Sequence, residues 1–231
     1  TEVKGELDYK ERFSRMQQHT GEHMLSGIIH RLYGYDNVGF HLGAAETTMD
    51  FNGELTSEQV REVETLANQA VWDNIPVEIL YPTKEELASM DYRSKIEIEG
   101  QVRIVTVPGY DVCACCAPHV KKTGEIGMLK LVNMVNYKGG ERITMLCGVR
   151  ALKDYEAKDA NGKEISALLC AKELEIADAV HHMKEEQTAL KSKVADLSGK
   201  LLAYRAKEIP VDVPIVTVFD ADLSGNGPRE L

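Results

Sequence analysis

Apolar residues recur along the first third of the chain at helical intervals. Between Phe13 and Leu32 they return every three or four positions, which predicts a helix that ends at Gly34, a residue suited to a left-handed C-cap. A second helix is predicted to begin after Thr56, which opens a T-x-x-Q capping box, and to end before Pro76. Its apolar stripe is typical of a helix packed on a core.

Alternating or short apolar runs predict strands in the rest of the first 150 residues. The predicted segments are residues 39–51 as a hairpin, 76–81, 96–107, 128–135 and 142–146. A short helix is expected over residues 84–90, and Gly139 and Gly140 are expected to form a turn. The pattern indicates an α+β fold, with an antiparallel-rich sheet packed with helices.

Beyond Arg150 the pattern changes to a helical arm, expected over residues 151–209 with an interruption near Asn161 and Gly162. Its apolar positions alternate steps of four and three, which predicts a coiled-coil seam with one polar member. The seam consists of Ile176, Val180, Met183, Gln187, Leu190, Val194, Leu197, Leu201 and Tyr204. Such a seam must be covered by residues 152–169, by a second copy of the chain, or by both. We therefore expect a homodimer through the arm.

The length of 231 residues suffices for one main domain and an appendage. No run of eighteen apolar residues and no charged-then-apolar leader is present, so we expect neither a membrane span nor secretion. The sequence starts at Thr1 without Met and stops within DLSGNGPREL, and we expect a fragment of a longer protein.

Five cysteines are present, and three of them crowd within four positions. An odd number without secretory signals favours reduced thiols, metal binding and a cytoplasmic location over disulfides. Cys115 is the preferred ligand, with Cys113 and Cys116 as alternatives, while Cys147 and Cys170 are expected to be small buried hydrophobes.

The most informative chemistry is a split set of four metal-type side chains. His19 and His23 stand in HTGEH, and Cys115 and His119 stand in CCAPH. Residues at i and i+4 project from one face of a helix, so each pair is expected to act as a preformed clamp, and together they make a tetrahedral zinc set. A closed structural site and a catalytic site both fit this set. HTGEH lacks the HExxH order of zinc peptidases.

Longer motifs around both pairs resemble one family. QQHTGEHMLSGI and CCAPHVKKTGEIG are similar to the editing domain of alanyl-tRNA synthetases and to freestanding AlaX proteins. GFHLG with TTMDF, LTSEQVREVETLANQAVWDNIPVEI and ERITMLCGVRAL agree in order. The resemblance covers residues 7–152 and continues more weakly to VTVFDADLSGNGPREL, so residues 210–231 resemble the start of a C-terminal domain found in longer members. One departure is Cys115-Cys116-Ala117-Pro118-His119, where the family usually has Cys-Gly-Gly-Thr-His.

The resemblance implies three parts, namely a zinc-dependent editing domain over residues 1–150, a helical arm over 151–209 and the start of a further domain over 210–231. It implies hydrolysis, in trans, of the ester that joins serine to the 3′ end of the alanine tRNA, with Zn²⁺ held by His19, His23, Cys115 and His119. Removal of glycine from the same tRNA is left open. The alternative is a structural-zinc module that binds tRNA or dimerises without hydrolysis.

An editing site must bind the serine hydroxyl favourably, because the synthetic pocket that accepts alanine cannot strongly exclude serine. Thr20, beside the first ligand, and Thr48 or Thr47 in the hairpin are the candidates for this contact. Glu22 is a candidate general base if it faces the metal, and the alternative is an outward-facing side chain. Thr20 also has a plain alternative, a bond to its own helix backbone.

The net charge of −10 is unfavourable for RNA binding, but basic residues follow the second pair. They are Lys121, Lys122, Lys130, Lys138, Arg142 and Arg150. Among them Lys121, Lys122 and Arg142 are expected to contact substrate, as is His41 in GFHLG. The alternatives are a merely solvated face for the basic residues and a structural or exposed histidine for His41. The expected partner is the acceptor end of tRNA(Ala) carrying serine.

Overall fold

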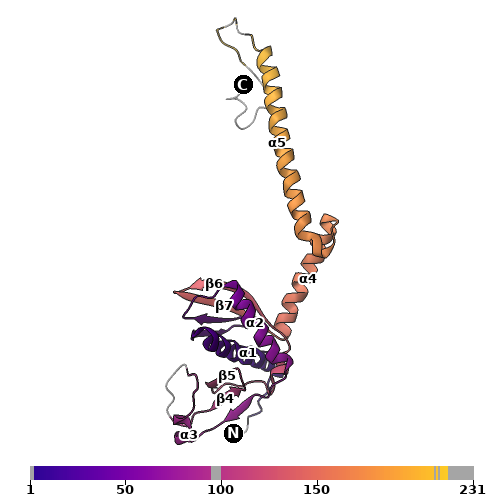
Figure 1. The fold of residues 1–231 in the computed structure, drawn as a ribbon. Helices are drawn as coiled ribbons and strands as arrows, with labels where there is room; N and C mark the ends of the chain where they lie inside the picture. The colour runs from indigo at the N-terminus through magenta and orange to yellow at the C-terminus, as the bar shows by residue number, and fades with distance from the viewer. Residues whose placement is uncertain (1–2, 95–99, 211, 213, 218–231) are drawn as a thin grey trace. The chain divides into compact units, whose positions relative to one another are not determined.

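A computed structural model of the chain describes residues 3–94, 100–210, 212 and 214–217 (Figure 1). Two compact units divide the chain, residues 1–158 and residues 159–231. The first contains both sheets, and the second is helical. The expected α+β class with antiparallel sheets is confirmed, whereas the expected domain limits at residues 150 and 209 stay a prediction.

The first unit contains two separate antiparallel sheets rather than one. The four-stranded sheet has the order β1-β2-β7-β6, and the three-stranded sheet has the order β3-β4-β5. The strands are β1 (Asn37–Leu42), β2 (Thr47–Phe51), β3 (Glu78–Leu80), β4 (Ile104–Val107), β5 (Asp111–Ala114), β6 (Leu129–Tyr137) and β7 (Gly140–Cys147). The helices are α1 (Tyr9–Tyr33), α2 (Ser57–Trp72), α3 (Lys84–Ala88) and the 3₁₀ turn η1 (Thr123–Ile126).

Helix α1 lies between the two sheets (Figure 1). It begins after Asp8, whose Oδ1 accepts the Glu11 N–H at 3.0 Å, and it ends at Gly34, which has φ 71° as the expected C-cap. Every residue from Gln17 to Ile29 is buried, because the helix is covered on more than one side. Side chains on every face of this stretch are therefore surrounded by other protein atoms.

Helix α2 packs its apolar stripe against α1 and the four-stranded sheet. Thr56 and Gln59 form both bonds of the expected capping box. The shared core includes Met24, Leu25, Ile28, Met49, Phe51, Val63, Ala67, Ile143 and Met145. This core fixes α1 on the sheet, and with it the side chains of its buried centre.

Most expected strands are confirmed, and three details differ. The turn between β6 and β7 uses Lys138 and Gly139, with φ 50° and 81°, so it lies one residue earlier than predicted. In the described part of the strand expected over residues 96–107, Ile104–Val107 is a strand and residues 100–103 are irregular; residues 96–99 lie outside the described part. Strand β5 was not expected at all.

The helical unit corrects two further expectations. Asn161 and Gly162 lie inside the continuous helix α4 (Val149–Leu169), because an interior glycine costs a helix only about 1 kcal/mol. The chain turns instead at Cys170, which has φ 50° and is exposed rather than buried. After η2 (Glu173–Glu175) it continues as α5 (Ile176–Glu208).

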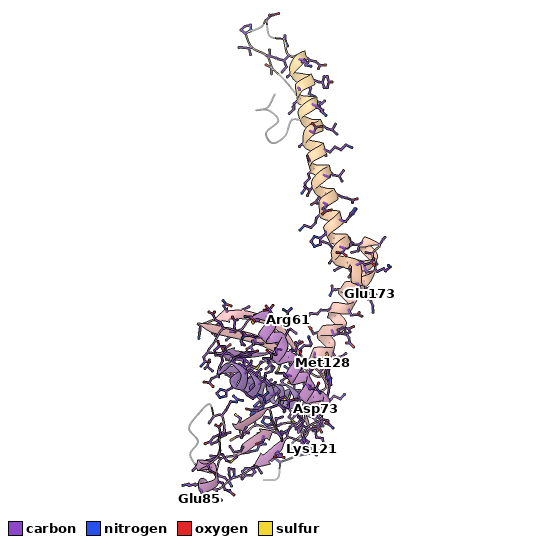
Figure 2. All side chains as sticks on the ribbon, in the orientation of Figure 1. Arg61, Asp73, Glu85, Lys121, Met128 and Glu173 are labelled. Carbon is purple, nitrogen blue, oxygen red and sulfur yellow. The ribbon has the colours of Figure 1, made fainter. Side chains whose placement is uncertain are left out.

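Most of the apolar seam of α5 is exposed in the described chain; Figure 2 draws the side chains along this helix. Leu190 and Val194 are each 62% exposed, and Met183, Leu197, Leu201 and Tyr204 are also exposed. Dimerisation through this seam stays a prediction. Among the described residues, no helix combines the length and the apolar character that a membrane span requires.

Gly27 lies where α1 approaches the chain around β5 closely. A methyl group added there would collide with the Tyr110 carbonyl oxygen and lie 2.8 Å from Asp111 Cβ. We expect Gly27→Ala to lower the free energy of unfolding by about 1–3 kcal/mol through overpacking. The measurement is urea unfolding followed by circular dichroism.

Gly162→Ala is the matched control, because a methyl group at Gly162 meets no atom within 4 Å. There we expect an unchanged or higher stability, since alanine favours a helix by about 0.5–1 kcal/mol. Equal effects of the two substitutions would contradict the steric explanation.

Candidate metal centre

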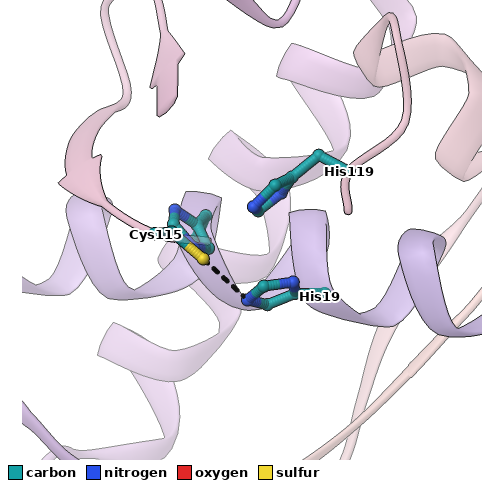
Figure 3. Close-up of side chains that lie close together, drawn as sticks. His19, Cys115 and His119 are labelled. Atoms are coloured by element: carbon teal, nitrogen blue, oxygen red, sulfur yellow. Dashed lines mark hydrogen bonds between the residues drawn. The ribbon is translucent and has the colours of Figure 1, made fainter. Parts of the chain in front are cut away.

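Four side chains from two distant segments meet beside the buried centre of α1. His19 and His23 come from the helix, and Cys115 and His119 come from the loop that follows β5. Their ligand atoms all lie within 4.8 Å of one another, and Cys115 Sγ lies 3.5 Å from His19 Nε2 (Figure 3). The structure thus brings together all four residues that the sequence pattern selected.

The two pairs are presented differently. His19 and His23 share a face of α1 as expected. Of the two placements that fit the second pair, a turn or a short helical segment at a strand end, the structure has the first, because the residues from Cys115 to His119 form an irregular loop after β5. Arg103 holds this loop, since its Nη1 donates to the carbonyl oxygens of Cys115 at 2.6 Å and Ala117 at 3.0 Å.

Each imidazole is oriented by a partner at Nδ1. His19 Nδ1 donates to the Pro118 carbonyl oxygen at 3.4 Å, and His23 Nδ1 lies 2.9 Å from Asp111 Oδ2. His119 Nδ1 lies 3.3 Å from Thr20 Oγ1. A hydrogen on Nδ1 leaves the Nε2 lone pair available, which is the form that ligates metals.

The Nε2 atom of His119 supports this interpretation. It is buried and makes no hydrogen bond within the described part of the chain. A buried nitrogen lone pair without a partner is costly, and a metal ion would satisfy it. The ring centroids of the three histidines lie 4.3 to 5.0 Å apart.

A buried ion pair lies behind His23. Asp111 accepts from Arg93 Nε at 2.8 Å through Oδ1 and from Arg93 Nη2 at 2.9 Å through Oδ2, which also faces His23. Burial alone would raise the pKa of Asp111, but the hydrogen bonds with His23 and Arg93 outweigh it and hold the pKa below its usual range. Sequence analysis missed both residues; the only signal was a carboxylate inside the segment DVCA.

The pKa shifts of Cys115 and His119 suit zinc, whereas that of His23 opposes it. Burial by itself would raise the pKa of Cys115, but the nearby imidazoles of His119, His19 and His23 lower it to about 3, which favours a thiolate. Burial lowers the pKa of His119 to about 4, so its imidazole is neutral near pH 7. Burial alone would lower the pKa of His23, but the bond to Asp111, the interaction with Cys115 and the charge of Glu22 together raise it to about 9. A metal ion would compete with that proton, because ligating imidazoles must be neutral.

The two alternative cysteines are less suited to this centre. Cys116 is exposed. Cys113 lies near His23 and Asp111, but burial raises the pKa of its thiol to about 12, which disfavours the thiolate that binds metals. Cys115 therefore remains the preferred ligand.

Glu22 and Thr20 both lie beside the centre. The outward-facing alternative for Glu22 is wrong, because its side chain is buried. Glu22 Oε1 accepts from Ser26 Oγ at 2.8 Å and Asn37 Nδ2 at 2.7 Å, while Oε2 lies 3.9 Å from His23 Nε2.

The Thr20 hydroxyl is held by three groups. It donates to the Met16 carbonyl oxygen at 2.9 Å, as expected for a bond to its own helix, and it accepts from the Val120 N–H at 3.2 Å. The third contact is with His119 Nδ1. Thr20 thus links α1 to the loop that carries the second pair.

The structure does not bring His41, Thr48 or Arg142 to the four donors. Strand alternation turns Phe40 toward His19, with ring centroids 5.6 Å apart, so His41 faces the opposite side of the sheet. Thr48 and Arg142 lie on that same side by register. There Arg142 donates to both carboxylate oxygens of Asp50, at 2.6 and 2.8 Å.

Two features lie closer to the centre. Lys121, labelled in Figure 2, and Lys122 are exposed and stand two and three residues after His119. A cavity of about 420 Å³ is lined in part by His19, Met16, Leu42 and Pro118. It offers a route from the surface to the donors.

Known proteins are similar in sequence to this chain over most of its length. The family described as threonyl and alanyl tRNA synthetase second additional domain matches residues 102–147. The alanyl-tRNA editing protein Aarsd1-B of Xenopus laevis is 30% identical over 212 residues, which are 90% of this chain and 52% of that protein. The alanyl-tRNA editing protein AlaX-L of Pyrococcus horikoshii is 26% identical over the same shares.

A longer relative is the alanine–tRNA ligase of Methanobrevibacter smithii, 25% identical over 91% of this chain and 24% of the ligase. The chain spans about half the length of the editing proteins it matches. These similarities confirm the resemblance that the motifs carry.

Asp111 is expected to set the affinity of the centre for zinc. Asp111→Asn keeps the shape but removes the charge that holds His23, so we expect zinc affinity to fall about 10- to 100-fold. The measurement is competition with a chromophoric chelator.

Asp36→Asn is the matched control. Asp36 also bonds a histidine, His30, at 2.9 Å, but that pair is exposed. Its substitution should leave zinc affinity unchanged. An equal loss in both variants would argue against orientation of His23 by Asp111.

Proposed function

Because this chain is homologous to alanyl-tRNA editing proteins and alanine–tRNA ligases, we propose that it is an aminoacyl-tRNA deacylase that edits mischarged tRNA(Ala). The proposed substrate is Ser-tRNA(Ala), with Gly-tRNA(Ala) as a second candidate, and the proposed place of action is the cytoplasm. The observation that carries the proposal is the meeting of His19, His23, Cys115 and His119 in a chain with this ancestry.

The donor set of three imidazoles and one thiolate suits Zn²⁺. When bound, zinc would supply Lewis acidity that activates water and polarises the ester carbonyl. The protein would supply the ligands, their orientation through Asp111, Thr20 and Pro118, and the exclusion of bulk water by the buried face of α1.

Glu22 is proposed as the general base. Because Ser26 and Asn37 hold Oε1, the carboxylate is fixed with Oε2 toward the donor cluster. Glu22 would take a proton from the attacking water as the water oxygen bonds to the ester carbon. When the ester C–O bond breaks, the proton passes to the leaving 3′ oxygen of the terminal ribose, and free serine and tRNA result.

Serine selectivity requires polar groups that alanine leaves unpaired, a route that can reach roughly 10⁴-fold. Thr20 is proposed for this contact, in exchange for one of its present bonds, and it positions His119 in either case. Lys121 and Lys122 are proposed to contact phosphates near the ester. His41, Thr48 and Arg142 would contact parts of the tRNA that reach the opposite face of the sheet.

A structural zinc module is the second candidate. Four protein donors are what a closed, fold-supporting site shows, and here they would tie α1 to the loop after β5. Such a module would need zinc to fold but would not need Glu22 for any reaction. Glu22 therefore separates the two functions.

Deacylation of Ser-tRNA(Ala) tests the proposal. We expect the zinc-loaded chain to release serine from Ser-tRNA(Ala) much faster than alanine from Ala-tRNA(Ala). His23→Ala and Cys115→Ala should lower the rate about 100-fold or more through loss of a ligand. Glu22→Gln should stay folded and retain zinc while its rate falls about 10²- to 10⁴-fold.

The controls are zinc content and thermal unfolding of every variant. A folded, zinc-loaded chain that releases serine no faster than buffer would contradict the deacylase and favour the structural module.

We also propose that the exposed seam of α5 forms a homodimer. Light scattering should give twice the 25.7 kDa of one chain. Leu190→Glu with Leu197→Glu should shift the mass to one chain, because each places a charge in an apolar seam. Ser192→Glu, on the far side of the helix by heptad position, should leave the dimer intact. A monomer at high protein concentration would contradict the dimer.

A further inference from the structure

A second cavity, of about 950 Å³, lies on another side of the first turns of α1, wholly within residues 1–158. It is lined by the start of α1, by the β1–β2 loop at Ala44 and Ala45, and by the start of α4. It shares Asp8 and Glu11 with the smaller cavity that reaches His19. The two cavities therefore adjoin the same short stretch of helix.

Arg150 is the notable group in this lining. Its side chain is only 10% exposed. Nε donates to Ser14 Oγ at 3.2 Å, and Nη1 donates to the Gly43 carbonyl oxygen at 2.9 Å. The buried Nη2 makes no hydrogen bond to any described residue; its contact with Glu11 Oε1 is an ion pair at 3.8 Å, too long for a hydrogen bond, and Glu11 is shared with Arg15.

A buried guanidinium with an unused donor is costly unless a ligand completes it. Neither Ser14 nor Gly43 carries a negative charge, so these two bonds fix the guanidinium without neutralising it. The two-point attachment also gives Arg150 one orientation. Arginine held in this way suits the oxygens of a phosphate group.

The acidic side chains of the lining already have partners. Asp8 caps α1, Glu11 accepts from Arg15 Nε at 2.7 Å, and Asp154 accepts from Lys158 Nζ at 2.6 Å. Positive charge also reaches this cavity. Helix α4 begins at Val149 in its lining, so the positive end of the helix dipole faces the cavity. The exposed side chains of Lys10 and Lys153 add two cations at the rim.

We propose that Arg150 binds a backbone phosphate of the tRNA acceptor strand in this cavity. The inference rests on the proposed function, because it takes RNA as the polyanion. A strand whose 3′ end enters the cavity at His19 would pass the N-terminal turns of α1 and meet the neighbouring cavity that holds Arg150. For phosphate binding at this cavity, the preoriented Arg150 guanidinium would then matter more than the net charge of −10 of the whole chain.

The experiment measures binding of uncharged tRNA(Ala) transcript at several salt concentrations. We expect Arg150→Gln to weaken binding roughly tenfold at low salt and to reduce the slope of log affinity against log salt by about one. Arg150→Lys should restore part of the slope, because it keeps the charge and loses the planar fork. Lys153→Gln, an exposed change that cannot disturb packing, should reduce the slope in the same direction.

The matched control is Arg61→Gln. Arg61, labelled in Figure 2, is an exposed arginine on α2 whose Nη2 pairs with Glu58 at 3.0 Å. Its loss removes the same charge and should leave affinity and slope unchanged. Circular dichroism and thermal unfolding establish that each variant is folded. Should both Arg150 variants fail to fold, Lys153→Gln with an unchanged slope would overturn the proposal.

Inorganic phosphate, added at constant ionic strength, separates two sources of the ligand. Phosphate binding that depends on Arg150, together with tRNA binding that does not, would mean a free-anion site and would overturn the proposal. A chain that binds tRNA(Ala) through Arg150 yet releases no serine would contradict the deacylase and support this inference. A chain that deacylates while Arg150→Gln keeps wild-type affinity and salt slope would overturn this inference alone.

Discussion

The close approach of α1 to the chain around β5 is the constraint on which the site depends. Gly27 allows it, because any side chain there would meet Tyr110 and Asp111. At that separation Asp111 reaches His23, and the loop that follows β5 arrives beside His19. The donor cluster is therefore built by packing between a helix and a strand, not by a local motif.

Charge compensation is the second requirement of this arrangement. Two carboxylates, a guanidinium, a thiol and three imidazoles are gathered in a largely buried region, and isolated charges there would be very costly. Asp111 is satisfied by Arg93 and His23, and Glu22 by Ser26 and Asn37. Zinc would neutralise the thiolate and remove the need for a proton on His23, so metal binding and folding are expected to be coupled.

Sequence patterns predicted the parts of the fold that local physics specifies. Caps and periodicity located α1 and α2, and alternation located the β1–β2 and β6–β7 hairpins. Strand β5 escaped because DVCA is short and carries an aspartate, and its pairing with β4 depends on distant residues. The roles of Arg93 and Asp111 were not predicted either, because their pairing also depends on residues distant in the sequence. His41 could be assigned a face only once Phe40 was known to stack on His19.

The CCAPH loop differs from the Cys-Gly-Gly-Thr-His pattern of the family it resembles, and this difference changes which groups of the site can contact a substrate. Pro118 has no N–H and no hydroxyl, so it cannot donate to a substrate as a threonine there could. Its carbonyl oxygen instead accepts from His19, and its fixed φ stiffens the loop between the two donors. Arg103 holds the preceding carbonyl oxygens. The loop thus serves to orient ligands, which is why the proposed substrate contacts fall on Thr20 and Glu22 of α1 and not on the loop.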